Sequence, residues 1–347
     1  MNKKVFFIMS TNDFSGAENV NFSIIDGLKE KYDFYWVSKK GNINRFLDER
    51  KIKWIEIKEL SVGEIRRVIK QFKPDILHAT DYKASVISAI AKKNNKHIKL
   101  IEHLHNNSSW LKKISINSIA FLYAGLKADE ILTVSESIER EYIFSNLISK
   151  KIRCIGNPVS RDNILKMVSE KDFEKIYDVC CVARIVKEKN PIKFLEIIAE
   201  IRKQIPNVNV IWIGKGELEE DVLKKTEELD LKNNVKFLGF KKNPYKYIAH
   251  SKVFMLTSDI EGYGLVAFEA LTLGVPCVVS KIGGLPSVVD ETCGKLCMLE
   301  EEFVNETLKL LKDKKFYQIK SNNAIKKSIK IENLNEYIDI IDKIYNI

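Results

Sequence analysis

The chain has 347 residues, of which 45% are hydrophobic and 30% are charged, with a formal net charge of +10. This composition is typical of a globular protein that is long enough to bury two cores. It excludes a membrane-spanning chain, because the nearest apolar run, 118–126, is far too short to cross a bilayer. The apolar run after Lys3 and Lys4 lacks a signal-peptide cleavage site, so we expect a cytoplasmic protein.

In the first half of the chain, short apolar runs alternate with amphipathic stretches. This alternation predicts a Rossmann-like unit, in which helices cover both faces of a parallel sheet. The predicted strands are 4–10, 33–38, 53–57, 75–80, 98–105 and 130–135, and the predicted helices are 17–31, 43–51, 62–72 and 83–94.

The same pattern begins again after a break near 155–164, so we predict a second α/β unit. We place the domains at 1–160 and 161–330, with a C-terminal helix within 331–347 that packs back towards the first domain. Ligands of open α/β sheets bind at the carboxyl ends of the strands, which predicts a site in a cleft between the units. The second set of strands is 176–184, 208–214, 235–239, 252–258 and 276–280, and its helices are 191–205, 218–229, 244–251 and 265–274.

The charge is concentrated in the first half of the chain. Residues 1–170 contain 29 Lys and Arg against 20 Asp and Glu, whereas residues 171–347 are almost balanced. This asymmetry favours an anionic partner, either membrane phospholipid, a lipid-linked phosphate or nucleic acid. A general bias towards lysine codons is the alternative explanation. The sequence contains no basic and aromatic motif typical of nucleic-acid binding, so we expect no nucleic-acid partner.

The six cysteines do not form a metal-binding pattern. Cys180 and Cys181 are adjacent in a predicted strand, and Cys293 and Cys297 have no histidine or second cysteine pair nearby. We therefore expect reduced, mostly buried thiols and no metal site.

The loop between the predicted strand 252–258 and the following helix contains the most informative residues. Gly262 and Gly264 allow the backbone to approach a ligand closely. The unpaired N–H groups of the first helical turn, at Leu265 and Val266 after Tyr263, form an anion site for a phosphate.

Glu261 and Glu269 lie eight positions apart on either side of this helix start, about 12 Å if the whole stretch were helical. Carboxylates accept hydrogen bonds from hydroxyl pairs. Glu269 lies among apolar neighbours, which argues against a solvated surface position. Phosphate on the helix and hydroxyl groups on the glutamates together predict a nucleoside-diphosphate sugar as ligand.

Two cations support a diphosphate site in the second unit. Arg184 ends the strand 176–184, and Lys189 follows in the loop to the next helix, so both could reach the same ligand. Gly214 opens another strand-to-helix turn. Because that turn lacks the third glycine of a dinucleotide motif, we interpret it as backbone of the base pocket.

On these residues the sequence resembles glycosyltransferase family 4, the retaining enzymes with a GT-B fold of two Rossmann-like domains. The resemblance covers nearly the whole chain and is strongest in EGYGLVAFEA, GVPCVVS and GGLPSVV, with further matches at ARIVKEKN, SGAE, KPDILHAT, ADEILTVSESI and IGNPVS. It implies that Glu261 contacts the donor sugar, that Glu269 binds ribose, that Arg184 and Lys189 bind the diphosphate, and that Gly16 lies against the phosphates. The sequence departs from the family at Ser15, where a glycine is commoner, and at NPVS.

The segment EHLHNN contains two candidate histidines, His103 and His105, on one face of a predicted strand. We choose His105, directly before the loop, for contact with the donor sugar, and we leave His103 open. The resemblance implies a mechanism without a metal or other cofactor, with a UDP-sugar as the favoured donor. The acceptor hydroxyl would attack on the face of the leaving phosphate, which would take its proton.

The family also implies a saccharide or lipid-pyrophosphate-linked acceptor and a role in making a surface polysaccharide, such as capsule, exopolysaccharide or O-antigen. The stretch 108–127, with Trp110 and three lysines, predicts a peripheral contact with the inner face of the cell membrane. A core helix with exposed lysines is the alternative. Two other functions remain open, a nucleotide-sugar epimerase of the same fold and a non-catalytic nucleotide-sugar-binding protein.

Overall fold

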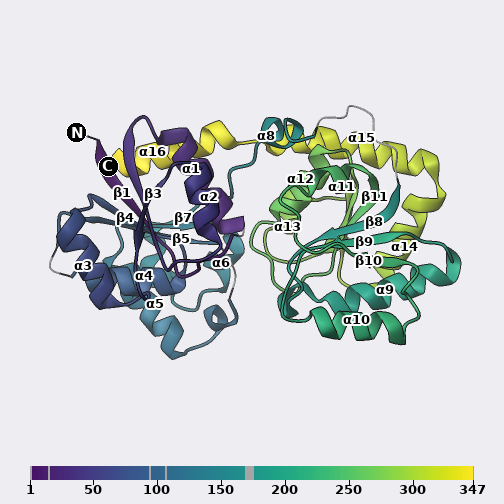
Figure 1. The fold of residues 1–347 in the computed structure, drawn as a ribbon, viewed down its shortest axis with the longest axis horizontal. Coiled ribbons are helices and arrows are strands. Elements are labelled where there is room, and N and C mark those ends of the chain that lie inside the picture. Colours follow the sequence, from purple (N-terminus) through teal and green to yellow (C-terminus); the bar gives the residue numbers. More distant parts are fainter. Residues whose placement is uncertain (1, 15, 94, 106–107, 169–175, 347) are drawn as a thin grey trace. The chain divides into compact units, whose positions relative to one another are not determined.

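The computed structural model describes residues 2–14, 16–93, 95–105, 108–168 and 176–346, and the chain forms two compact units (Figure 1). Unit 1 contains Met1–Pro158 and Leu334–Ile347, and unit 2 contains Val159–Asn333. Each unit is built around one parallel sheet. The prediction of two parallel-sheet α/β domains is therefore confirmed.

The sheet of unit 1 has seven strands in the order β3-β2-β1-β4-β5-β6-β7. Its central strands are buried on both faces, as in Phe6 and Phe7, which are fully buried in β1. The strands are β1 (Lys3–Ile8), β2 (Tyr32–Ser38), β3 (Lys53–Glu56), β4 (Ile76–Ala79), β5 (Lys99–Leu104), β6 (Glu130–Thr133) and β7 (Ile152–Cys154).

Helices α1, α2 and α16 lie on one face of this sheet, and α3, α4 and α5 lie on the other (Figure 1). Local sequence explains several helix starts; Ser61 and Asp81, for example, accept backbone N–H groups of the first turns of α3 and α4. The helices are α1 (Gly16–Leu28), α2 (Ile43–Glu49), α3 (Val62–Phe72), α4 (Tyr82–Ala91), η1 (Ser109–Lys112), α5 (Ile116–Lys127), α6 (Glu136–Glu141), α7 (Ser145–Ile148), η2 (Ser149–Lys151) and α16 (Leu334–Asn346).

The sheet of unit 2 has six strands in the order β10-β9-β8-β11-β12-β13. Strands β8 and β11, which precede the predicted site loops, are neighbours in the middle of this sheet. The strands are β8 (Tyr177–Val182), β9 (Val210–Ile213), β10 (Val235–Phe237), β11 (Ser251–Leu256), β12 (Cys277–Ser280) and β13 (Gly294–Cys297).

In unit 2, α9 and α10 lie on one face of the sheet and α12 and α13 on the other (Figure 1). Helix α9 begins with Pro191 after the capping residue Asn190. The helices are α8 (Arg161–Leu165), η3 (Lys187–Lys189), α9 (Pro191–Gln204), α10 (Glu219–Glu228), α11 (Tyr245–Ala249), α12 (Leu265–Thr272), α13 (Leu285–Val288), α14 (Glu300–Lys312) and α15 (Lys314–Ile331).

The chain passes between the units twice, and hydrogen bonds join the two connections. The N–H of Val159 donates to the side-chain oxygen of Asn333 at 3.0 Å, and the N–H of Asn333 donates to the carbonyl of Val159 at 3.2 Å. After the second connection the chain forms α16, which belongs to unit 1. All six cysteines are free thiols; Cys154 is exposed and the other five are buried.

Candidate functional site

The predicted glycine-rich loop follows β11 and leads into α12. Gly264 is the N-cap of α12 with φ of 87°, a left-handed conformation that favours glycine. A Cβ at this position would lie 2.5 Å from Cδ2 of Leu285. The next residues, Leu265 and Val266, open the helix, so their N–H groups have no carbonyl one turn earlier in the helix to bond. The local geometry therefore leaves N–H donors at the helix start, the type of group that binds anions in other proteins.

A second glycine pair supports this loop from behind. A Cβ on Gly283 would lie 1.8 Å from the carbonyl oxygen of Glu261, and one on Gly284 would lie 2.4 Å from that of Gly262. The N–H of Gly284 also donates to the Gly262 carbonyl at 2.7 Å. The segment 283–289 contributed to the family resemblance, but sequence reasoning assigned these two glycines no role. The structure shows that their missing side chains let the loop that carries Glu261 pack backbone to backbone.

Two of the predicted site residues form an ion pair. Nζ of Lys189, in the loop after β8, lies 2.7 Å from Oε2 of Glu261, in the loop after β11. The two side chains are only 18% and 13% exposed, so solvent screens this pair less than a surface pair. The structure therefore brings together an acid and a base that are 72 positions apart in the sequence.

Backbone contacts hold these two loops together. The N–H groups of Asp259 and Ile260 both donate to the carbonyl of Glu188, at 2.9 and 3.3 Å. The side-chain amide of Asn190 donates to the carboxylate of Asp259. Arg184 starts the same β8 loop and is exposed, so its guanidinium is accessible to a ligand.

Glu269 lies one helical turn into α12 and is paired with a tyrosine. The hydroxyl of Tyr245, in α11, donates to Oε1 of Glu269 at 3.4 Å. Burial raises the pKa of Glu269 to about 8, and the hydrogen bond from Tyr245 acts in the opposite direction. The charge of Glu269, together with burial, raises the pKa of Tyr245. Sequence reasoning missed Tyr245, because α11 shows no motif and meets α12 only in the fold.

Gly214 lies where three loops meet. Its φ of 143° and a distance of 1.9 Å from a hypothetical Cβ to the carbonyl oxygen of Ala183 both require glycine. Its N–H donates to the carbonyl of Gly239 at 3.0 Å. The structure therefore gives Gly214 a backbone role between the loops that follow β8, β9 and β10. Gly262 and Tyr263 are buried in the β11 loop.

The remaining two predicted residues belong to unit 1. Gly16 is exposed and is the first residue of α1, while its neighbour Ser15 lies outside the described residues. His105 follows β5 directly and is only 8% exposed. Its ring lies 4.0 Å from that of His103 between centroids, and burial lowers its pKa to about 3. Neither ring nitrogen of His105 has a hydrogen-bond partner among the described residues.

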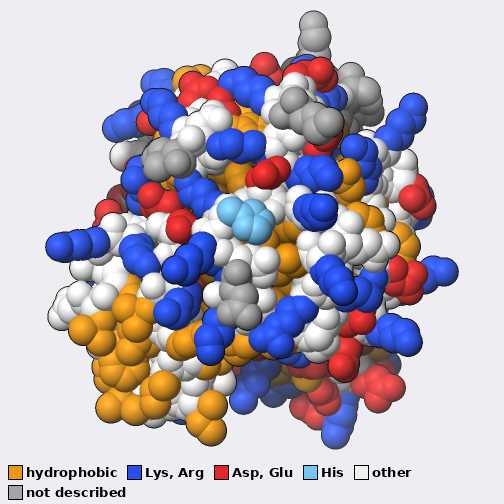
Figure 2. Space-filling model, turned by 90° about the vertical axis from the view of Figure 1, so that its left-hand side faces the viewer, with side chains coloured by type: hydrophobic (Ala, Val, Ile, Leu, Met, Phe, Trp, Pro, Cys, Tyr) orange, Lys and Arg blue, Asp and Glu red, His pale blue; other side chains and the backbone are white. Residues whose placement is uncertain are grey.

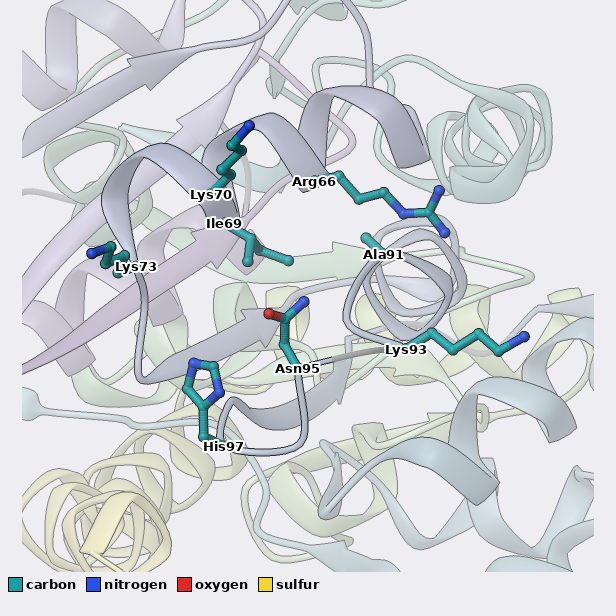
Figure 3. Close-up of a pocket in the computed structure, with 8 residues that line it drawn as sticks. All are labelled: Arg66, Ile69, Lys70, Lys73, Ala91, Lys93, Asn95 and His97. Atoms are coloured by element: carbon teal, nitrogen blue, oxygen red, sulfur yellow. The ribbon is translucent and has the colours of Figure 1, made fainter.

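Unit 1 also contains a basic pocket of about 400 Å³ that includes none of the predicted site residues (Figure 3). It lies at the C-terminal ends of α3 and α4, where a guanidinium nitrogen of Arg66 donates to the carbonyl of Ile90 at 3.5 Å. Cations at these ends are favourable because they offset the negative end of the helix dipole. The lining residues are Arg66, Ile69, Lys70, Lys73, Ala91, Lys93, Asn95 and His97. Within the described ranges, no three His, Cys, Asp or Glu side chains are placed to hold a metal ion.

Comparison with protein families gives two matches that follow one another along the chain. Residues 15–163 match the model described as Glycosyltransferase Family 4. Residues 164–327 match the model described as Glycosyl transferases group 1. The junction between the two matches lies close to the boundary between units 1 and 2.

Several curated proteins are similar in sequence. A 4-α-N-acetylgalactosaminyltransferase of Campylobacter jejuni, named for N-acetylgalactosamine-N,N'-diacetylbacillosaminyl-diphospho-undecaprenol, is 26% identical over 87% of each chain. A galactosyltransferase of Escherichia coli, named for α-D-GlcNAc-diphosphoundecaprenol, is 25% identical over 95% of this chain and 93% of its own. The uncharacterized glycosyltransferase MJ1059 of Methanocaldococcus jannaschii is 27% identical, and the match spans 62% of this chain and 57% of that relative.

Among solved structures, HepE of Anabaena in complex with UDP and glucose superimposes with a TM-score of 0.85. The match covers 99% of this chain and all of the other, at 19% sequence identity. This likeness shows the fold.

The glycine support of the β11 loop leads to a stability prediction. Gly283→Ala should lower the free energy of unfolding by at least about 1–2 kcal/mol, because alanine is strained at its φ of 54° and its Cβ would overlap the Glu261 carbonyl. Gly63→Ala in α3 is the matched control, since a Cβ there would meet only the Oγ of Ser61 at an unstrained 4.0 Å. This substitution should be neutral or stabilising. Urea unfolding of both variants measures the difference; equal stabilities would show that the loop tolerates a side chain.

Proposed function

The chain belongs to glycosyltransferase family 4 and has the GT-B fold, and on that premise we propose that it transfers a hexose-type sugar from a nucleoside-diphosphate sugar to a hydroxyl of a saccharide or lipid-linked saccharide, with retention of configuration. The observation that carries this proposal is the Lys189–Glu261 ion pair beside the start of α12. It combines a cation, a carboxylate and free helical N–H groups, the set that a sugar diphosphate requires. The UDP complexes of HepE support UDP as the nucleotide.

In this proposal, different residues of unit 2 bind different parts of the donor nucleotide sugar. Lys189, exposed Arg184 and the first N–H groups of α12 bind the diphosphate, and Glu269 accepts hydrogen bonds from the ribose hydroxyls. As the bond to the sugar breaks, negative charge grows on the leaving diphosphate and positive charge on the sugar. The same cations stabilise the former, and Glu261, freed from Lys189, stabilises the latter.

His105 and Gly16 act from unit 1 in this proposal. Burial keeps His105 neutral above a pKa of about 3, so it contributes a hydrogen bond to the donor sugar rather than a positive charge. Its two ring nitrogens are buried and without a described partner, which is costly unless a ligand or solvent satisfies them. Gly16, exposed at the first turn of α1, offers backbone to the phosphates.

We propose a lipid-linked saccharide as acceptor and a surface polysaccharide as product, supported by the undecaprenol-linked substrates named for two relatives. Such an acceptor is anchored in a membrane, so the enzyme must work at its surface. Within the described ranges, no helix combines the length and apolar character needed to cross a bilayer. Binding at the inner surface of the cell membrane is therefore part of the proposal.

One apolar surface of unit 1 suits that contact. Figure 2 shows hydrophobic side chains gathered at the lower edge of the face it draws, at the height of α5 in Figure 1, with Lys and Arg side chains nearby. Lys112, Lys113 and Lys127 are exposed in the same segment, which suits an anionic surface. We call this surface the α5 face; its exposed residues are Ile114, Ile116, Ile119, Tyr123, Leu126, Ile143 and Leu147.

Trp110, which we expected at the membrane, is half-buried and packs against two aromatic side chains. Its ring lies 4.6 Å from that of Tyr82 and 5.6 Å from that of Phe121, between centroids. It therefore packs behind the α5 face, and the isoleucines provide the exposed apolar area of that face.

The general proposal is tested by incubating the purified protein with a panel of nucleotide sugars, with and without a lipid-linked acceptor. Acceptor-dependent release of nucleoside diphosphate supports a transferase. Isomerisation of the donor without an acceptor would support the epimerase, and binding without turnover would support the non-catalytic alternative.

The ion pair predicts opposite effects for its two partners. Lys189→Ala should weaken binding of the nucleoside diphosphate about tenfold to a hundredfold, since a hydrogen bond to a charged group contributes about 1.5–3 kcal/mol. Glu261→Gln should retain or improve that affinity, because Lys189 loses its competing partner, yet should lower kcat. Lys187→Ala, an exposed lysine in the same loop, is the control. If Glu261→Gln alone lost nucleotide affinity, Glu261 and not Lys189 would be the residue that binds the nucleoside diphosphate.

The raised pKa of Glu269 predicts a pH dependence of nucleotide binding. Ribose hydroxyls donate to the carboxylate, so binding favours the charged form and releases a proton. Affinity should therefore rise with pH, by up to about tenfold per unit, and level off above the free-protein pKa of about 8. Glu269→Gln should remove this component. Tyr245→Phe should move the inflection to higher pH, because its hydroxyl lowers the pKa of Glu269.

Isothermal titration calorimetry at pH 6.5–9 measures this component as the difference between wild type and Glu269→Gln. Taking the difference cancels titration of the nucleotide's own phosphate. Identical pH profiles for the two proteins would contradict contact between Glu269 and the ligand.

The α5 face predicts membrane binding with two components. The pair Ile116→Ser and Ile119→Ser should weaken sedimentation with anionic vesicles at least about tenfold, because each isoleucine loses apolar burial. Raising the salt concentration should weaken binding of the wild type. Ile329→Ser, an exposed isoleucine of unit 2, is the control. Equal binding to neutral and anionic vesicles would remove the electrostatic component, and unchanged binding of the double variant would exclude this face.

A further inference from the structure

A continuous set of buried hydrogen bonds lies beneath His105. The hydroxyl of Tyr345 is 2.7 Å from Nδ1 of His78, Nε2 of His78 is 3.1 Å from Nδ1 of His103, and Nε2 of His103 is 3.4 Å from the hydroxyl of Tyr337. All four side chains are at most 1% exposed. We call these residues the histidine–tyrosine chain.

The strand register explains why the two histidines meet. Strands β4 and β5 are parallel neighbours in which His78 is paired with Ile101. His103 is two residues further along β5, so it lies on the same face of the sheet as Ile101 and His78. His105 continues that face at the end of β5. The carboxyl-end edge of the sheet is thus lined by three histidines from two adjacent strands.

Because both histidines are neutral, all hydrogen bonds of this chain must run in the same donor-to-acceptor direction. Burial lowers the pKa of both His78 and His103, so each neutral ring has one N–H donor and one acceptor nitrogen. The hydrogen bonds must therefore all run from Tyr345 to Tyr337 or all run the other way. Either arrangement fixes the tautomer of both rings.

His105 depends on this chain for support. Its ring packs against that of His103 in a tilted arrangement, with 4.0 Å between centroids and 37° between planes. Its own nitrogens have no hydrogen-bond partner among the described residues. The orientation of His103 therefore determines the surface on which His105 rests, while the nitrogens of His105 remain available to a ligand.

Both tyrosines come from α16, the last helix of the chain, and unit 1 holds this helix by other contacts as well. The hydroxyl of Tyr32 donates to Oδ1 of Asp342 at 2.7 Å. Nζ of Lys3 donates to the carbonyl of Tyr345 at 3.0 Å, and Nζ of Lys99 donates to that of Ile344. These lysines satisfy carbonyls at the helix end and offset its negative dipole. The helix can therefore remain bound without the two tyrosine hydroxyls.

We propose that Tyr337 and Tyr345 are positioning residues for His105, acting through His103 and His78. The inference rests on the proposed contact between His105 and the donor sugar. It explains why polar groups occupy the core between α16 and the sheet, where apolar side chains would also hold the helix and where each polar group must be satisfied.

The test uses variants that remove one hydroxyl each. Tyr337→Phe should lower kcat between about tenfold and a hundredfold with the KM for the donor nearly unchanged, because a misplaced group affects the reacting geometry more than binding. Tyr345→Phe should also lower kcat, but by a smaller factor, since Tyr345 is one residue further from His105 along the chain of contacts. Tyr32→Phe is the matched control: it removes a hydroxyl that also holds α16 but touches no histidine, so it should reduce stability and leave kcat unchanged.

A double-mutant cycle separates positioning from simple stabilisation. In a His105→Ala background, Tyr337→Phe should have no further effect on kcat. Imidazole ¹H–¹⁵N spectra give a second readout without turnover: His78 and His103 should each be a single neutral tautomer, and the His105 signals should shift in Tyr337→Phe and in Tyr345→Phe but not in Tyr32→Phe.

The outcomes distinguish this inference from the proposed role of His105. Full activity of His105→Ala would overturn both. An inactive His105→Ala with normal kcat in the two α16 tyrosine variants would overturn only the positioning role. A Tyr337→Phe effect that persists in the His105→Ala background would also overturn it. If Tyr337→Phe does not fold, Tyr345→Phe and its imidazole spectrum decide the question in the same way.

Discussion

The close approach of backbone to backbone at the carboxyl end of the unit 2 sheet is the constraint on which the site depends. At Gly214 and Gly283, a hypothetical Cβ would lie within 2 Å of a carbonyl oxygen from a neighbouring loop. The first contact joins the loops after β8 and β9, and the second joins the loops after β11 and β12. Hydrogen bonds from the N–H groups of Asp259 and Ile260 to the carbonyl of Glu188 join the β8 and β11 loops. Since parallel neighbours end at the same edge, the loops can then place Lys189 against Glu261. The glycines therefore affect the site only by allowing the loops to pack closely, and not through side chains of their own.

The two glutamates of the α12 region differ because their surroundings differ. Glu261 faces a lysine and is held as part of an ion pair. Glu269 accepts a hydrogen bond from the neutral hydroxyl of Tyr245, and burial raises its pKa to about 8. In the proposed function, a diphosphate displaces the charged partner of Glu261, and Glu269 exchanges its proton for hydroxyl donors. This difference suits a ligand with charge at one end and hydroxyl groups at the other.

Sequence patterns predicted the features that depend on residues close together in the chain. The alternation of strands and helices indicated two parallel sheets, and the motif around Glu261 indicated a loop and helix start in the place where the structure has them. Short elements with weak patterns, β7 and β13, were missed. So were the contacts made by Tyr245 and Gly283, because each partner lies in a different element and no period or motif links them. The role of each site residue stays a prediction.

The histidine–tyrosine chain could not be predicted from the sequence either, because its partners are very far apart along the chain. His103 and Tyr337 are separated by 234 positions, and His78 and Tyr345 by 267, so nothing in either local sequence indicates the other. From the sequence, His103 and His105 were both candidates on one strand face, and only the position of His105 directly before the loop favoured it. The fold separates them: His103 has both nitrogens engaged within the core, whereas those of His105 have no described partner. A buried ring with both nitrogens engaged is suited to support, and one with free nitrogens is suited to bind. The fold thus gives a physical reason to prefer His105 over His103 for the proposed contact with the sugar. It also makes α16 part of the structure that supports His105.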